Sequence, residues 1–256
     1  MKEKPLILIV NDDGFEAKGL WALVKAAAPF GELVIVAPDS HRSGMGHAIT
    51  MNSPLRIHQH TTPDGIAYYR TNGTPVDCVK LALQVILKER KVDLLLSGIN
   101  HGSNASANLI YSGTMGAAIE GSFANIPSMG ISLLDYSPNA DFEAATAISS
   151  MLIQKVLATP IPNHTSLNVN IPKLPLSEIK GIKVVRQTFG AWHEDFEERK
   201  DVYGNPYYWM AGELIIEDRG EDNCQWALAH QYVSVQPVQF DMTAYKHINT
   251  LKFLEQ

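Results

Sequence analysis

The chain has 256 residues, of which 45% are hydrophobic and 19% are charged, and its formal net charge is −6. These values are typical of a soluble globular protein with one large domain, or with one domain and an extension. The acidic balance, without a block of lysine or arginine, argues against a nucleic-acid polymer or an anionic membrane as partner. No apolar run approaches the roughly 20 residues that a membrane span requires.

The apolar start of the chain is interpreted as a first strand rather than as a signal peptide. The run LILIV at 6–10 meets two aspartates almost at once and does not continue to a small-residue cleavage site. Cys78 and Cys224 are far apart, and two such cysteines neither define a disulfide framework nor supply a zinc site. These features fit a cytoplasmic protein.

Apolar runs and helical patterns alternate along the first two thirds of the chain. The runs that predict buried strands are 6–10, 33–37, 92–98, 126–134 and 166–171. The segments with helical periodicity are 17–28, 75–90, 112–124 and 139–157. Strands of this kind alternating with helices predict a Rossmann-like α/β fold, with a mostly parallel sheet covered by helices on both faces.

Two local patterns are well marked. The helix at 75–90 is predicted to start with Thr74 as N-cap, Pro75 in its first turn and Asp77 as the capping-box partner. Residues 55–72 predict a β-hairpin, because two strand-like runs flank a Pro-Asp-Gly turn.

The character of the chain changes after residue 172. We therefore expect an α/β core at 1–172 and a β-rich extension at 173–256, which packs either on this core or against a second subunit. Its expected elements are an aromatic strand at 207–216, a strand at 231–241 and a short amphipathic helix at the C-terminus. A two-stranded unit is only marginally stable alone, so these strands need either their own core or a second subunit.

In an open parallel sheet, ligands bind at the carboxyl ends of the strands, and three polar loops of this chain follow strands. The first holds Asp12 and Asp13, whose adjacent carboxylates repel each other and resist burial. Their oxygens would suit a hard divalent cation such as Mg²⁺ or Mn²⁺. An Asx turn that caps the next helix is an equally good explanation of two adjacent acids alone.

The second loop, APDSHRSGMGHAIT, offers Ser43 between two histidines, His41 and His47. Its GMG lacks the third glycine of a dinucleotide fingerprint and follows the wrong strand, and the chain contains no P-loop. Loop histidines of this kind can serve as general acids or ligands, but on sequence alone they are interpreted as bystanders.

The third loop, SGINHGSNASANLIYSGTMGAA, places Asn100 at the end of a buried strand, where its amide oxygen could complete a metal shell. A helix then starts with Ser112 as N-cap, followed by Gly113 and Thr114. The free N–H groups of a helix N-terminus favour phosphate. By itself, however, this segment is more typical of a plain capped helix that packs closely through the small residues Gly116, Ala117 and Ala118.

Taken together, these motifs resemble the SurE family, the stationary-phase survival proteins that act as 5′/3′-nucleotidases. The blocks that carry the resemblance are ILIVNDDGFEAKGL, VIVAPDSHRSGMGHAIT, TNGTPVDCVKLAL, SGINHGSN followed by YSGTMGAA, and YVSVQP. They span nearly the whole chain, and their order and spacing are highly specific.

The resemblance implies a Rossmann-like phosphatase that holds one divalent cation per subunit, Mg²⁺ or Mn²⁺. It implies hydrolysis of nucleoside 5′- and 3′-monophosphates and of short polyphosphate, and a homodimer or homotetramer. The family's metal ligands fall on Asp12, Asp13, Ser43 and Asn100, of which Asp12 and Asp13 would be catalytic. Its phosphate-binding residues fall on Asn104, Ser112, Gly113 and Thr114.

The chain departs from the family pattern in one loop. Where the family has N-x-G-x-D, this chain has Asn104-Ala-Ser-Ala-Asn108, with Ser106 in place of the glycine. This affects the shape of the loop and the substrate preference, but not the metal ligands. Gln236 also stands where threonine is common.

Several alternatives remain open on sequence alone. The cation would polarise a phosphate ester and lower the pKa of a bound water, with Asp13 as general base, or one acid could be a nucleophile. Because the acids are adjacent rather than spaced as Asp-x-Asp, direct attack by water is favoured. The rival functions are a non-catalytic nucleotide-binding regulatory domain and a metal-dependent glycosyltransferase.

Overall fold

The computed structural model describes residues 4–63, 65–159 and 161–255, and its centre is a nine-stranded sheet. Across the sheet the strands run in the order β3-β4-β2-β1-β5-β6-β7-β11-β8. Their bounds are β1 (Leu6–Val10), β2 (Glu32–Pro38), β3 (Ile57–Thr61), β4 (Ala67–Thr71), β5 (Leu94–His101), β6 (Ser128–Leu133), β7 (Thr165–Ile171), β8 (Gly181–Val184) and β11 (Tyr232–Gln239).

The sheet is mostly parallel, as the sequence predicts. Only the β3–β4 and β7–β11 pairs are antiparallel. From β1 the chain passes to β2 on one side, and it later returns to β5 on the other side of β1. The direction of winding therefore changes between β1 and β5, and a crevice forms at their carboxyl ends.

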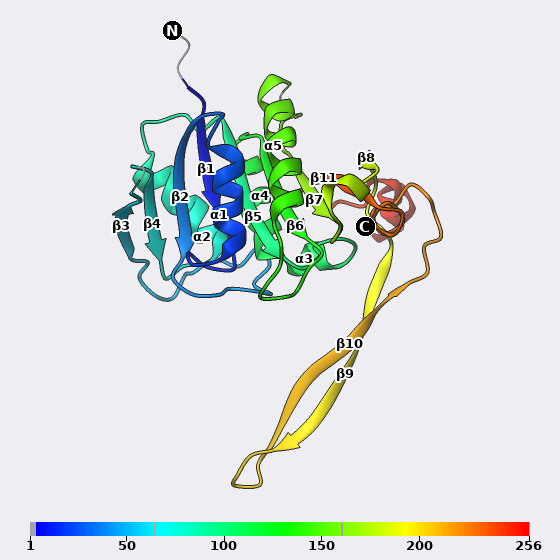
Figure 1. The fold of residues 1–256 in the computed structure, drawn as a ribbon. Helices are drawn as coiled ribbons and strands as arrows, with labels where there is room; N and C mark the ends of the chain where they lie inside the picture. Colours follow the sequence, from blue (N-terminus) through cyan, green and yellow to red (C-terminus); the bar gives the residue numbers. More distant parts are fainter. Residues whose placement is uncertain (1–3, 64, 160, 256) are drawn as a thin grey trace.

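Helices cover both faces of the sheet, which confirms the predicted fold class (Figure 1). One layer consists of α1 (Lys18–Ala27) and α5 (Glu143–Ala158), which pack against each other. The other consists of α2 (Pro75–Leu81) and α4 (Gly113–Phe123), also in contact. No helix among the described residues is both long and apolar enough to cross a bilayer.

The predicted start of α2 is confirmed, but its end differs from the prediction. Thr74 Oγ1 accepts a hydrogen bond from the backbone N–H of Asp77 at 3.1 Å, and Asp77 Oδ2 accepts one from the N–H of Thr74 at 2.9 Å. After Leu81 the α-helix changes to a π-helical segment, η1 (Ala82–Ile86), instead of continuing to residue 90. The Leu87 N–H bonds to the Ala82 carbonyl, five residues back, at 2.8 Å.

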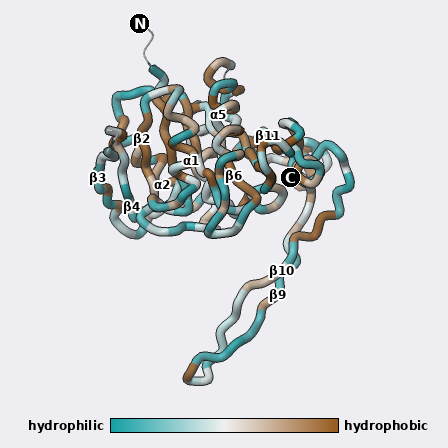
Figure 2. Tube along the Cα trace, viewed as in Figure 1, coloured by the Kyte–Doolittle hydropathy of each residue, from teal (hydrophilic) through white to brown (hydrophobic). Residues whose placement is uncertain are grey.

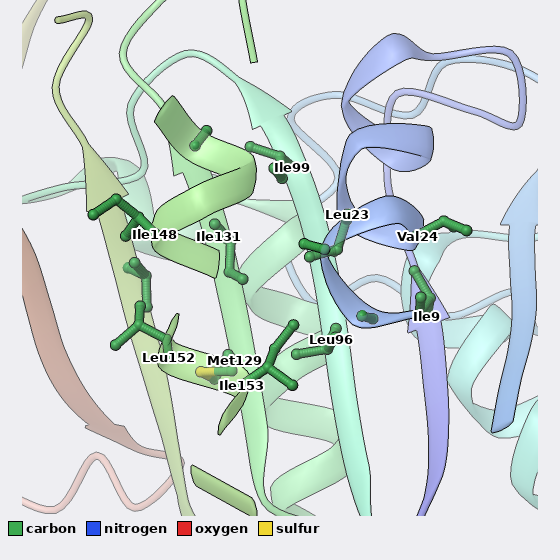
Figure 3. Packing of buried hydrophobic residues seen from close by; sticks show 14 of the residues in the cluster. Ile9, Leu23, Val24, Leu96, Ile99, Met129, Ile131, Ile148, Leu152 and Ile153 are labelled. Atoms are coloured by element: carbon green, nitrogen blue, oxygen red, sulfur yellow. The ribbon is translucent and has the colours of Figure 1, made fainter. Parts of the chain in front are cut away.

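The main hydrophobic core lies between the sheet and the α1/α5 layer (Figure 3). Alternate residues of the central strands, such as Ile9, Leu96 and Ile131, are 0% exposed there and meet Leu23 and Ile153 from the two helices. Figure 2 shows that hydrophobic residues are concentrated in this body of the molecule. This core makes the sheet a rigid support for the loops at its carboxyl edge.

The predicted hairpin is formed by β3 and β4, which pair from Ile57–Thr71 to Thr61–Ala67. Its loop is closed by a hydrogen bond from the Thr62 N–H to the Ile66 carbonyl at 2.9 Å. Gly65 has a φ of +82°, a left-handed conformation that glycine adopts easily. Asp64, the central residue of the predicted turn, lies outside the described residues.

The strands after residue 172 pair differently from the sequence-based expectation. The predicted strand 231–241 is β11, which enters the main sheet between β7 and β8. The aromatic strand is β10 (Pro206–Ile216), and it pairs with β9 (Gly190–Lys200), a strand that the sequence did not indicate. Together β9 and β10 form a long hairpin, here called the arm, that projects away from the body (Figure 1).

The expected amphipathic helix at the C-terminus is a pair of 3₁₀ segments and not an α-helix. Residues 245–254 form two 3₁₀ segments, η3 (Tyr245–His247) and η4 (Asn249–Leu254), and their apolar side chains are exposed. So short a segment is only marginally stable as an α-helix without a packing surface. The remaining short helices are α3 (Asn108–Tyr111), η2 (Leu176–Glu178) and α6 (Cys224–Ala229).

Candidate active site

The loops after β1, β2 and β5 meet at the carboxyl edge of the sheet around one cavity of about 530 Å³. The lining of this cavity includes five of the predicted site residues: Asp12, Ser43, Asn100, Asn104 and Ser112. The other three, Asp13, Gly113 and Thr114, neighbour these residues in the sequence. The structure therefore brings together residues that lie about a hundred positions apart.

Asp12 is a buried carboxylate at the end of β1, with 3% of its surface exposed. Its Oδ1 accepts a hydrogen bond from Thr114 Oγ1 at 2.7 Å, and its main-chain carbonyl accepts one from the Arg42 N–H at 2.8 Å. Burial and, secondarily, the charge of Asp13 raise the pKa of Asp12 to about 6. The surrounding protein therefore compensates the negative charge of Asp12 only in part.

Asp13 is also largely shielded, with 6% of its side chain exposed. Its Oδ2 accepts a hydrogen bond from the backbone N–H of His101 at 3.2 Å, and its Oδ1 lies 3.4 Å from Nδ1 of His41. Burial raises the pKa of Asp13 above its usual range. Each of these two neighbouring carboxylates thus accepts few hydrogen bonds, so the pair favours binding either a proton or a cation.

Of the two loop histidines, only His41 is engaged at the site. Its Nε2 lies 2.8 Å from Ser43 Oγ, so its ring connects Ser43 with Asp13. His41 therefore contacts two of the predicted metal ligands, although its ring does not line the cavity. His47 instead lies 2.9 Å from Oε2 of Glu120 and does not line the cavity.

Asn100 lies near the end of β5, next to an irregularity in the pairing of β5 with β6. Such an irregularity can turn a side chain away from the regular alternation of a strand. The Asn100 Nδ2 donates a hydrogen bond to the Gly102 carbonyl at 2.9 Å, which fixes the carboxamide. Its Oδ1 accepts no hydrogen bond from the described residues, and it remains available as a ligand.

The N-terminus of α4 is directed at Asp12. Ser112 Oγ accepts a hydrogen bond from the Met115 N–H at 3.0 Å and thereby caps the helix. A Cβ at Gly113 would lie 3.1 Å from Asp12 Cβ, a tight contact, so glycine at this position favours the close approach of the helix to Asp12. The Gly113 and Thr114 N–H groups belong to the first turn, where intrahelical partners are lacking, and such groups bind anions.

The identity of the protein family follows from comparison with known proteins. The family model described as "Survival protein SurE" matches residues 7–194. The chain belongs to the SurE family. Among curated relatives, "5′-nucleotidase SurE" of Flavobacterium psychrophilum is 49% identical over 97% of this chain and 96% of its own length. The protein of the same name from Christiangramia forsetii is 50% identical over 98% of this chain and 96% of its own length.

A solved SurE structure agrees with the fold of this chain. The crystal structure of the SurE protein from Aquifex aeolicus superimposes with a TM-score of 0.85 at 42% identity, covering 98% of this chain and 100% of that chain. The resemblance seen in the sequence motifs is thereby confirmed, and the prediction of an enzyme of this family is supported by the names of the relatives.

The loop that departs from the SurE pattern is bound to the root of the arm. Ser106, with a φ of +58°, adopts a left-handed conformation that is unusual for serine. Its hydroxyl donates a hydrogen bond to the Thr188 carbonyl at 3.0 Å, and its carbonyl accepts one from Gln187 Nε2 at 3.0 Å. Asn108 Oδ1 accepts a hydrogen bond from the Trp192 indole at 2.8 Å.

Sequence reasoning missed the residues that form the outer wall of the cavity. From the arm these include Trp192, Glu194 and Met210, and from the body they include Tyr111 and Tyr136. The two tyrosines follow predicted strands or precede the predicted helix start at Ser112 in the sequence, so their positions could have indicated that they line the site. Trp192 and Glu194 gave no such signal, because their strand β9 is rich in charged residues and its sequence is typical of a solvated segment.

The donor set at this edge fits a hard cation. No group of three or more His, Cys, Asp or Glu that could hold a metal is found in the described parts of the chain. The predicted ligands Asp12, Asp13, Ser43 and Asn100 instead combine two carboxylates with a hydroxyl and a carboxamide, and all four can supply oxygen atoms. The incompletely compensated Asp12 and the unbonded Oδ1 of Asn100 are what a site for Mg²⁺ or Mn²⁺ would provide.

Proposed function

We propose that this protein is a metal-dependent phosphomonoesterase that hydrolyses nucleoside 5′- and 3′-monophosphates to nucleoside and phosphate, and that also accepts short polyphosphate. The name of these relatives, 5′-nucleotidase SurE, supports the 5′-nucleotidase activity. The metal dependence, the 3′-activity and the polyphosphate activity are the finer parts of the proposal.

The observation that carries the proposal is the approach of α4 to Asp12. Two carboxylates that need a cation and a helix N-terminus that attracts anions lie at the same cavity, and Gly113 allows contact between them. A phosphate monoester carries negative charge on its oxygens. The carboxylates alone would repel it, so binding requires both the cation that they hold and the N–H groups of the helix N-terminus. The site therefore favours phosphate esters over neutral substrates.

Asp12, Asp13, Ser43 and Asn100 would hold the cation, Mg²⁺ or Mn²⁺, one per subunit. When bound, a cation of this kind acts as a Lewis acid and lowers the pKa of a coordinated water. Thr114 keeps the Asp12 carboxylate oriented through its hydroxyl, and the backbone of His101 does the same for Asp13.

The chain's own groups bind and orient the phosphate. The N–H groups of Gly113 and Thr114 would bind the phosphoryl oxygens, and the Ser112 hydroxyl holds this first turn in place as its N-cap. Asn104 Nδ2 donates one hydrogen bond to Ser132 Oγ at 2.8 Å, and its second hydrogen can bond to a phosphate oxygen. The outer wall of the cavity, with Trp192 and Tyr111, would accept the nucleoside.

We favour direct attack by water over a covalent aspartyl intermediate. Asp13 would accept the proton of the attacking water, and the phosphorus–oxygen bond to the nucleoside would break with the electron pair going to the leaving oxygen.

Release of inorganic phosphate from a panel of substrates tests this function. Nucleoside 5′- and 3′-monophosphates and tripolyphosphate are each incubated with the protein, with a chelator or with Mg²⁺ or Mn²⁺. We expect turnover of the monophosphates only with metal. Metal-independent binding of nucleotide without turnover would instead support a regulatory nucleotide-binding domain, and a transferred sugar would support a glycosyltransferase.

We further propose a homo-oligomer, at least a dimer, in which the arm of the 173–256 extension contacts a second subunit. A two-stranded hairpin is marginally stable alone, and this one projects from the body with Phe196, Tyr208, Trp209 and Met210 each more than half exposed. Aromatic side chains and methionine are typical of interface cores. Whether the assembly is a dimer or a tetramer is decided by its mass in solution.

We also propose that the protein acts in the cytoplasm on small-molecule nucleotides rather than on nucleic-acid polymers. Cys78 and Cys224 are both buried and are not joined to each other, as expected for a reducing compartment. The net charge of −6 disfavours binding to a polyanion.

A further inference from the structure

The face of β6, β7 and β11 that α4 covers carries two neighbouring rows of buried polar side chains. Ser132, Asn170 and Ser234 are cross-strand neighbours in one row, and each is 0% exposed. In the next row Asn168 lies beside Gln236. The α4 helix packs against β6 and β7, so water does not reach this face.

Strand geometry does not require polar residues here. The opposite face of the same strands is hydrophobic, with Val169 and Ile171 in the main core. A fully buried carboxamide is unfavourable unless its donors and its acceptor are bonded. The two asparagines of β7 must therefore have specific partners, and their contacts show what these are.

Both asparagines of β7 bond to the main chain of Asn104. The Asn104 N–H donates to Asn170 Oδ1 at 2.8 Å, and the Asn104 carbonyl accepts from Asn168 Nδ2 at 2.8 Å. Asn170 Nδ2 donates to Asn168 Oδ1 at 2.9 Å, so the two carboxamides are linked and each fixes the orientation of the other.

We propose that Asn168 and Asn170 are positioning residues for Asn104 and, through it, for the bound phosphate. The proposal rests on the proposed function, because it is there that Asn104 binds phosphate. Both amide groups flanking Asn104 are held from the rigid sheet, while Ser132 holds its side chain. These three contacts fix both the main chain and the side chain of Asn104, so the remaining hydrogen of its Nδ2 is held in one orientation relative to the cavity.

The test compares Asn170→Ala and Asn168→Ala with Ser234→Ala. Ser234 is a matched control, because it lies in the same buried row as Asn170 but its Oγ has no hydrogen-bond partner among the described residues. KM and the inhibition constant of inorganic phosphate should each rise about tenfold or more in the asparagine variants. The Mn²⁺ requirement should not change, and Ser234→Ala should behave as the unmodified protein. An unchanged phosphate inhibition constant in both asparagine variants overturns the proposal.

A double variant separates action through Asn104 from a separate effect on the fold. If Asn170 acts through Asn104, then Asn104→Ala combined with Asn170→Ala should bind phosphate no more weakly than Asn104→Ala alone. If the loss of phosphate affinity in the double variant equals the product of the losses in the two single variants, then Asn170 acts independently of Asn104, which contradicts the proposal. If Asn170→Ala does not fold, then Asn170→Ser, which keeps the position polar but is too short to reach Asn104, replaces it.

Hydrogen exchange provides a readout that does not depend on turnover. In the unmodified protein the Asn104 N–H is bonded to a buried acceptor, so its exchange should be slow. Exchange of this amide should be faster in the Asn170 variant, while the α5 amides keep their protection. Equal protection in both proteins would overturn the positioning by Asn170. If the unmodified protein released no phosphate from any substrate, the proposed function would fail, but this measurement would still decide the positioning of Asn104.

Discussion

Thr114 Oγ1 donates a 2.7 Å hydrogen bond to Asp12 Oδ1 and so joins the first turn of α4 to the end of β1. The same threonine presents its backbone N–H at the helix N-terminus. The proposed metal ligand and the proposed phosphate site are therefore connected through one residue, so a change at Thr114 should affect both.

Replacing Thr114 with valine keeps its shape but removes the hydroxyl. Because Asp12 then loses its only side-chain donor among the described residues, we expect metal affinity to fall about 10- to 100-fold, as for other partners of metal ligands. Phosphate release titrated with Mn²⁺ measures this effect. Thr114→Ser, which keeps the hydroxyl, is the control, and equal Mn²⁺ requirements in all three proteins would contradict the prediction.

Asp12→Asn and Asp13→Asn should each abolish phosphate release while the fold remains intact. Each change removes one of the two charges that would bind the cation, and a carboxamide is a much weaker ligand for a hard divalent ion. Phosphate release at saturating Mg²⁺ or Mn²⁺, with circular dichroism to verify folding, is the measurement. Near-normal turnover in either variant would show that the metal assignment is wrong.

Ser43→Ala and Asn100→Ala should be milder than the aspartate changes. Both residues would contribute neutral oxygens, which a water molecule can replace in the shell of a hard cation. We expect their maximal rates to be largely recovered at high metal concentration, with a raised metal requirement. Complete loss of activity that no metal concentration restores would indicate a direct part in the chemistry.

The stability of the metal-free protein should depend on pH through Asp12. Its pKa in the folded protein is about 6, above the ordinary value of 3.8, so the folded state binds this proton more tightly than the unfolded chain. The stabilisation is complete below the ordinary pKa and is lost as the pH rises through the folded-state pKa, by up to about 3 kcal/mol.

Asp12→Asn should remove this dependence. In the presence of a chelator the variant should melt at a higher temperature than the unmodified protein at neutral pH, because a neutral side chain replaces a buried charge. The difference should shrink as the pH is lowered from 7 towards 4, because Asp12 then becomes protonated and neutral in the folded protein. Thermal unfolding of both proteins across this range is the measurement, and a constant difference would show that the titration of Asp12 is not its cause.

Removing the arm should abolish subunit association without disturbing the sheet. A short glycine-serine linker in place of residues 191–215 leaves β11 in the main sheet, whereas ending the chain near residue 200 would also remove β11. Light scattering at micromolar concentration should show an oligomer for the intact protein and a monomer for the variant. A monomer mass for the intact protein would show that the arm does not join subunits.

A single substitution separates association from the active site, because arm residues such as Trp192 also line the cavity. Trp209 is 60% exposed and is not part of that lining, so Trp209→Ser should weaken association and leave the cavity unchanged. Val85→Ser provides the control, since Val85 is equally exposed on the body in η1.

Much of this fold could be predicted from hydrophobic periodicity. The first strand was predicted with its observed bounds, 6–10, and α4 begins one residue after its predicted N-cap. Such patterns succeed because burial in a doubly covered sheet requires continuous apolar runs, and because a helix N-terminus requires a capping side chain. The same reasoning placed the polar loops at one edge, since parallel strands end on the same side.

The strand β9 could not be predicted in this way. Its charged residues cover no core, and it forms only because β10 pairs with it along its whole length. The asparagines in SLNVNI did contain a signal, because in a sheet covered on both faces every residue of a central strand is buried, and Asn168 and Asn170 interrupt the apolar run expected there. That signal shows burial but does not identify the partner.

The chemistry of each loop was determined by the sequence itself: adjacent carboxylates, a capped helix start and amide side chains at strand ends. Only the tertiary structure decided which of these groups meet. Thr114 and Asp12 are 102 positions apart, and Asn104 and Asn170 are 66 positions apart. Contacts of this kind depend on how strands are ordered in the sheet and how closely α4 packs on it, and neither property leaves a local pattern in the chain.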